Sequence, residues 1–136
     1  RTELMPTIAA RYRTTNERGI IGESLAGLFT VETLFLEPDL FDTYIAFDPS
    51  IWWNNNELAN ASAARMRAIG NAKRTLYLAS SRDDRAGMVG KLADSLRKNA
   101  PPSLTIFFEA MPGESHATIY HPAALLAIRR LFKPQQ

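Results

Sequence analysis

A serine flanked by glycines is the first residue in this sequence whose surroundings suggest chemistry. Residues 22–27 read Gly-Glu-Ser-Leu-Ala-Gly, which places Ser24 in a variant of the Gly-x-Ser-x-Gly pattern with Ala26 at the second glycine position and Gly27 directly after it. A short apolar segment at 19–22 precedes it and a helical apolar stretch at 25–36 follows, so the pattern predicts a tight strand-to-helix turn. Such a turn projects the serine hydroxyl away from the sheet, and the glycines let neighbouring backbone come close. We predict that Ser24 is a nucleophile; the alternative is a turn that only joins strand to helix.

The residue after this serine has a predicted role through its backbone. At the start of a helix the first N–H groups have no intrahelical acceptor, and the peptide dipoles favour negative charge there. The N–H of Leu25 is therefore a candidate oxyanion donor in acyl transfer.

A histidine late in the chain could serve as the base. The sequence has two histidines, and His116 lies in a loop that follows a predicted strand at 103–109. There it could take a proton from Ser24 and return it to a leaving group. His121 directly precedes Pro122 at the start of a predicted helix, where a capping or surface role fits better.

Two aspartates could complete the set. The predicted strand at 74–79 is followed by Ser-Ser-Arg-Asp-Asp, which ends in Asp83 and Asp84. Either carboxylate could orient the imidazole of a catalytic histidine, and we favour Asp83 because it lies nearer the strand end. A solvated polar turn is the alternative. The resulting chain order of serine, aspartate and histidine is the order found in α/β-hydrolases.

Both tryptophans of the chain, Trp52 and Trp53, follow the next predicted strand, 43–47. That loop should emerge at the same edge of a parallel sheet as the serine. The two rings could form a wall of a substrate pocket, or could anchor the loop on the sheet.

Helices and strands alternate along the whole chain. The hydrophobic pattern predicts helices at 2–14, 25–36, 57–68, 85–99 and 121–132, and strands at 19–22, 43–47, 74–79 and 103–109. The strands are nearly continuously apolar, as in a parallel sheet covered on both faces. The predicted fold class is therefore α/β, with a mostly parallel sheet and helices on both faces.

The amino-acid composition excludes several kinds of site and argues against several kinds of partner. The chain has 136 residues, a formal net charge of +2 and no cysteine, which excludes disulfides, zinc–thiolate sites and a cysteine nucleophile. The basic residues form only loose groups without interleaved aromatics, which argues against nucleic-acid binding. No apolar run approaches the ~20 residues of a membrane span. The predicted chemistry needs a small-molecule ester and neither a cofactor nor a metal.

Taken together, these motifs resemble the putative-esterase family of α/β-hydrolases, most closely its enterobactin-esterase-like and esterase D-like serine hydrolases. The resemblance rests on residues 4–6 with Tyr12-Arg13, and on residues 20–28, 38–41, 49–53 and 114–116. It implies hydrolysis of carboxylic esters, with Ser24 as nucleophile and His116 as base. Family relatives include acyltransferases, and some siderophore-esterase relatives work with a Ser-His pair alone.

The resemblance also predicts how much of the α/β-hydrolase fold this sequence contains. In this fold several strands precede the nucleophile, and an early loop supplies the second oxyanion N–H. Only one predicted helix and one predicted strand precede Ser24 here. We therefore expect residues 1–136 to be a single partial domain that corresponds to the C-terminal portion of the fold. An acyltransferase or an inactive hydrolase-like binding module are the alternative functions.

Overall fold

The computed structural model describes residues 2–67 and 69–132. Four strands form one sheet in the order β1-β2-β3-β4, and every neighbouring pair is parallel. The elements in chain order are α1 (Leu4–Arg11), β1 (Gly19–Glu23), α2 (Ser24–Leu36), β2 (Thr43–Phe47), α3 (Trp53–Arg67), β3 (Arg74–Ser81), a 3-10 turn η1 (Arg85–Gly87), α4 (Met88–Asn99), β4 (Leu104–Met111) and α5 (Tyr120–Leu131).

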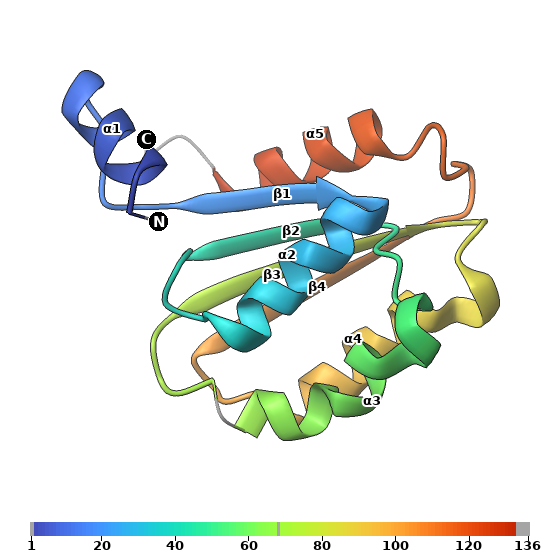
Figure 1. Ribbon diagram of the computed structural model, residues 1–136. Helices are drawn as coiled ribbons and strands as arrows, with labels where there is room; N and C mark the ends of the chain where they lie inside the picture. Colours follow the sequence, from blue (N-terminus) through green and yellow to red (C-terminus); the bar gives the residue numbers. More distant parts are fainter. Residues whose placement is uncertain (1, 68, 133–136) are drawn as a thin grey trace.

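Helices cover both faces of the sheet (Figure 1). On one face α2 and α4 pack against the strands and α3 packs against these two helices, around a core that includes Leu34, Leu76 and Leu96. On the other face α5 contributes Ala123 and Ala127 to a smaller core with β2 and β3. This three-layer arrangement explains why the strands between the layers are apolar on both sides.

The two central strands are the most deeply buried. In β2 the last four residues are buried, and in β3 the last six are. β1 and β4 form the edges of the sheet and are only partly covered. Because the carboxyl halves of the central strands are enclosed, the loops that follow them start from fixed positions.

The predicted α/β class is confirmed, with differences at several element boundaries. The first helix is α1, which is shorter than the predicted 2–14 and has no buried residue. Helix α3 is bounded by Trp53 and Arg67, but the asparagines at 54–56 have left-handed backbone conformation, so its right-handed part begins at Glu57 as predicted. The expected helix at 85–99 starts as a 3-10 turn and becomes α-helical only at Met88. At the first helix and at this one, tertiary context sets a boundary that the hydrophobic period cannot define.

Within the described ranges, no helix has both the length and the apolar character needed to cross a membrane.

Candidate active site

Ser24 occupies the junction between β1 and α2. The strand ends at Glu23, the helix begins at Ser24, and the backbone φ of Ser24 is 58°. A positive φ at a residue with a side chain costs of order 1–3 kcal/mol, and such conformations cluster at functional sites. The predicted strand-to-helix turn is thus present, and it is strained at the serine.

The glycines of the motif make room for this turn. A Cβ on Gly22 would lie 2.4 Å from the carbonyl oxygen of Ala26, so the first turn of α2 folds tightly back on the end of β1. A Cβ on Gly27 would lie 3.1 Å from the carbonyl oxygen of Phe47 and 3.1 Å from Cα of Pro49. The first glycine is therefore required by the turn itself, and the second by close packing of α2 against the end of β2.

Leu25 is the second residue of α2. Its N–H is among the first helical N–H groups, which have no intrahelical acceptor, and it carries the positive end of the helix dipole. This place in the helix fits the role predicted for the Leu25 N–H, and its role as an oxyanion donor remains a prediction.

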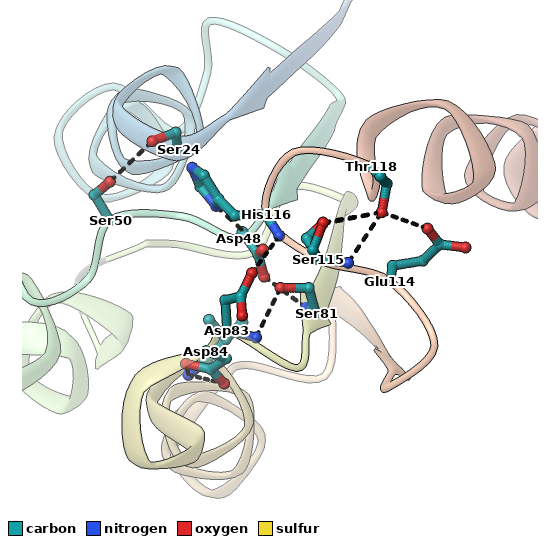
Figure 2. A network of polar contacts seen from close by, with 11 residues as sticks. Ser24, Asp48, Ser50, Ser81, Asp83, Asp84, Glu114, Ser115, His116 and Thr118 are labelled. Atoms are coloured by element: carbon teal, nitrogen blue, oxygen red, sulfur yellow. Dashed lines mark hydrogen bonds and ion pairs between the residues drawn. The ribbon is translucent and has the colours of Figure 1, made fainter.

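His116 lies on the loop between β4 and α5, and two aspartates contact it (Figure 2). Its backbone N–H donates to Oδ2 of Asp83 at 2.8 Å. Its ring Nδ1 lies 3.2 Å from Oδ2 of Asp48. Figure 2 shows the imidazole between Asp48 and Ser24, with its other edge directed toward the serine. His121 is exposed near the start of α5, whose N-cap residue is Ile119, and its ring lies beside Tyr120.

Asp48 is the site residue that sequence reasoning did not single out. It is the first residue after β2, its side chain is 5% exposed, and its backbone φ is 39°. Its Oδ1 accepts the backbone N–H of Ser81 at 2.6 Å. The available signal was an acidic residue at the end of a buried strand, but Asp-Pro-Ser also has the composition of an ordinary turn.

The two aspartates proposed from the sequence lie beside the site but contact other groups. Asp83 accepts the main-chain N–H of His116, and no contact between its carboxylate and the imidazole is seen. Both carboxylate oxygens of Asp84 accept the N–H of Val89, at 3.2 and 3.3 Å, in the first turn of α4. Burial raises the pKa of Asp84, and the hydrogen bonds from the N–H groups of Val89 and Met88 offset that rise only in part. Asp83 as the orienting acid remains a prediction.

The strand register brings these distant residues to one edge of the sheet. Glu23 pairs with Phe47, and Phe47 pairs with Ala79, so the start of α2 and the loops after β2 and β3 leave the sheet at the same edge. Between them lies a cleft of about 290 Å³. Its lining is Ser24, Asp48, Pro49, Ser50, Ile51, Trp52, Asp83, Asp84, Arg85, Met88, Val89 and His116.

The two tryptophans line different hollows. Trp52 lines the cleft with Ser24, and the guanidinium of Arg85 lies over its ring at 5.5 Å from the centroid. Trp53 lines a different hollow, next to Leu28 and Leu58, although the two indole rings contact each other at 5.9 Å. The geometry therefore supports a substrate contact for Trp52 and a different environment for Trp53.

The hydroxyl of Ser24 has a second serine beside it. Oγ of Ser50 lies 3.3 Å from Oγ of Ser24, and the N–H of Ser50 donates to the carbonyl oxygen of Ser24 at 3.0 Å. Ser50 is 3% exposed. In this resting arrangement, the neighbouring loop holds the Ser24 turn through both side chain and main chain.

The cleft is lined by two serine hydroxyls, one imidazole and three carboxylates. Among the residues that the structure describes, no three histidine or acidic side chains are arranged to hold a metal ion. The groups present can supply nucleophilic attack, proton transfer and charge stabilisation.

A strained serine at a strand-to-helix turn, on a parallel α/β sheet and beside a loop histidine, is the arrangement found in α/β-hydrolases. Residues 1–116 match the protein family described as putative esterase, and the chain belongs to that family.

Curated relatives match shorter segments. The siderophore enterobactin esterase of Emericella nidulans is 49% identical over 39 residues, which are 29% of this chain and 13% of that protein. The ferri-bacillibactin esterase BesA of Bacillus subtilis is 47% identical over 53 residues, or 38% of this chain and 18% of that protein.

Among solved structures, an IroE-like serine hydrolase from Shewanella oneidensis superposes with a TM-score of 0.84 at 28% identity. The match covers 96% of this chain and 44% of that hydrolase. This chain thus spans less than half the length of that structural relative, and the segments matched in the curated relatives are smaller still.

Proposed function

We propose that the protein hydrolyses carboxylic esters through an acyl-enzyme on Ser24, with His116 as general base. One observation carries the proposal. The strained serine of the β1–α2 turn and the ring of His116 face the same cleft, and a buried carboxylate lies on the far side of that ring. The family membership supports ester hydrolysis as the reaction class.

In the first half of this reaction, Oγ of Ser24 attacks the carbonyl carbon of the ester. Nε2 of His116 takes the hydroxyl proton, and the carbonyl oxygen becomes an oxyanion that the N–H of Leu25 can stabilise. Collapse of this intermediate breaks the ester C–O bond. The imidazolium of His116 then donates its proton to the departing alkoxide, which leaves as an alcohol.

In the second half, water attacks the acyl carbon. His116 takes a proton from that water, and the second tetrahedral intermediate releases the carboxylic acid and restores the hydroxyl of Ser24. A carboxylate beside the histidine stabilises the imidazolium formed in both halves, and Asp48 and Asp83 both contact His116.

Siderophore esters are the substrate class that we propose. The two curated relatives named above act on enterobactin and ferri-bacillibactin according to their names. In this chain the cleft has a half-exposed indole at Trp52 and a cation at Arg85 stacked on it. These two groups suit an aromatic, anionic ligand, because an indole face and a guanidinium bind aromatic rings and negative charge.

Ester cleavage by wild-type protein and by a Ser24→Ala variant tests the proposal. A short p-nitrophenyl ester and a ferric siderophore ester serve as substrates, and Ser103→Ala is the matched control because Ser103 lies near the start of β4, outside the cleft. We expect Ser24→Ala to lower kcat by at least about 10³-fold, because a nucleophile and its base act as a unit. No cleavage by the wild type, or equal cleavage by both proteins, would rule the function out.

A further inference from the structure

We propose that Asp48 is the positioning residue that orients the imidazole of His116, and that Asp83 instead holds the backbone of the loop that carries this histidine. The inference rests on the proposed function, since it divides two roles within the same site. The residue that orients the imidazole is then Asp48, directly after β2, and not Asp83, in the loop after β3.

The contacts of Asp48 fix its carboxylate at both oxygens. Oδ2 lies 3.2 Å from Nδ1 of His116, and Oδ1 accepts the N–H of Ser81 at 2.6 Å. The backbone N–H of Asp48 donates to the carbonyl oxygen of Ala79 at 2.9 Å. Hydrogen bonds from both its main chain and its side chain therefore hold Asp48 on β3, independently of its contact with the imidazole.

The carboxylate of Asp48 and the imidazole of His116 differ in solvent exposure. The side chain of Asp48 is 5% exposed, whereas that of His116 is 49% exposed. A buried, hydrogen-bonded carboxylate keeps its direction, and the open side of the ring remains free to exchange a proton with Ser24 or a substrate. The positive φ of Asp48, 39°, is the kind of backbone outlier that persists where the surrounding structure enforces it.

Asp83 contacts the main chain of His116 and not its ring. Its Oδ2 accepts the main-chain N–H of His116 at 2.8 Å, and its own N–H donates to Oγ of Ser81 at 3.1 Å. A hydrogen bond to a backbone N–H does not change when the imidazole gains or loses a proton. Asp83 therefore fixes where the histidine sits, and its contact has no preference between ring tautomers.

Ser81 connects the two aspartates. It is the last residue of β3 and is buried, and its N–H binds Asp48 while its hydroxyl binds the N–H of Asp83. One strand end thus orders both acids, which explains how two carboxylates can contact one histidine from different sides.

The two roles predict different effects of the same substitution. In Asp48→Asn the amide keeps an oxygen for Ser81, but its NH₂ group now faces Nδ1 and favours the tautomer with the proton on Nε2. In triads of this kind the corresponding change lowers kcat by about 10⁴-fold. Asp83→Asn keeps an acceptor oxygen for the backbone N–H of His116, so its effect should stay within about tenfold.

Steady-state kinetics on wild type, Asp48→Asn and Asp83→Asn separate the roles, with Asp94→Asn on the exposed face of α4 as the matched control. We expect Asp48→Asn to lose about 10³- to 10⁴-fold in kcat with little change in KM, and the control to equal the wild type. Asp48→Asn within tenfold of the wild type, or Asp83→Asn as impaired as Asp48→Asn, would overturn the inference.

A measurement on the wild type keeps the inference testable if Asp48→Asn does not fold. Nitrogen NMR of ¹⁵N-histidine-labelled protein reports the ring tautomer, and His116→Ala identifies the signal. We expect neutral His116 to carry its proton on Nδ1, facing Asp48. A neutral His116 with its proton on Nε2 would overturn the inference that Asp48 orients the ring. A wild type that shows the Nδ1 tautomer but cleaves no ester would disprove the proposed function and leave the pairing with Asp48 intact.

Discussion

Oγ of Ser24 and Oγ of Ser50 lie 3.3 Å apart, so two hydroxyls share the position at which a nucleophile is expected. Only one of them belongs to the strained turn. Ser24 has a φ of 58° and begins α2, whereas Ser50 follows Pro49 in the loop after β2. The helix dipole and the N–H of Leu25 favour the first serine as the attacking group.

The Ser50→Ala variant tests this distinction. We expect kcat/KM to remain within about tenfold of the wild type, because the lost hydrogen bond positions Ser24 but takes no part in bond formation. Steady-state hydrolysis of a p-nitrophenyl ester measures the effect. A loss as large as that of Ser24→Ala would mean that Ser50 is itself essential to the chemistry.

Gly22→Ala should prevent the strand-to-helix turn from forming. Its new methyl group would lie 2.4 Å from the carbonyl oxygen of Ala26, which is backbone and cannot rotate away. Overpacking usually costs about 1–3 kcal/mol, and a backbone clash this close should reach at least about 3 kcal/mol. Urea unfolding measures the loss in free energy. Gly113→Ala is the control, since a Cβ there meets nothing within 4 Å, and equal stability of the two variants would contradict the packing argument.

Trp52→Ala and Trp53→Ala should affect substrate binding unequally. Only Trp52 lines the cleft that contains Ser24, whereas Trp53 lines the hollow beside Leu58. We expect Trp52→Ala to raise KM for an aromatic ester about tenfold, equivalent to ~1.4 kcal/mol, and Trp53→Ala to change it less than about twofold. The reverse order, measured with the same ester, would show that the substrate lies on the other side of the loop.

Asp84→Asn should change how stability depends on pH. Burial raises the pKa of Asp84 above its ordinary value of 3.8, so the folded state disfavours the charged form. The group's favourable contribution is complete below pH 3.8 and is lost as the pH rises through the higher pKa of the folded state. The variant, which cannot ionise and retains an acceptor for Val89, should therefore gain stability relative to the wild type between these pH values.

Unfolding free energies of both proteins from pH 3 to pH 7 would check this sign. We expect the difference to be small at the acidic end and to favour Asp84→Asn at neutral pH. A difference that favours the wild type increasingly as the pH rises would show that the ionised carboxylate stabilises the fold.

Local sequence signals were sufficient for much of the fold and for part of the site. The apolar run at 43–47 predicts β2 with its observed ends, and the Gly-x-Ser-x-Ala-Gly segment at 22–27 predicts the turn at Ser24. These features depend on neighbouring residues, which a sequence displays directly. The loop position of His116 follows in the same way from the strand before it.

Asp48 could not be found by the same reasoning. It lies 68 residues from His116 in the chain, and their contact depends on parallel register, on the loop after β4 and on the N–H of Ser81. The order of serine, aspartate and histidine along the chain fits Asp48 as well as Asp83, and the acid was instead expected after the predicted strand at 74–79. The structure shows that Asp83 contacts the main chain of the histidine, a distinction that residue type and order do not carry.

Reaction with a fluorophosphonate probe, followed by mass spectrometry of the labelled peptide, tests the nucleophile most directly. The probe forms a covalent bond only with an activated serine, so labelling measures nucleophilicity without knowledge of the natural ester. We predict one adduct, on Ser24, that is absent from Ser24→Ala and persists in Ser50→Ala. An unlabelled wild type, or an adduct that survives in Ser24→Ala, would contradict the assignment of Ser24 as the nucleophile.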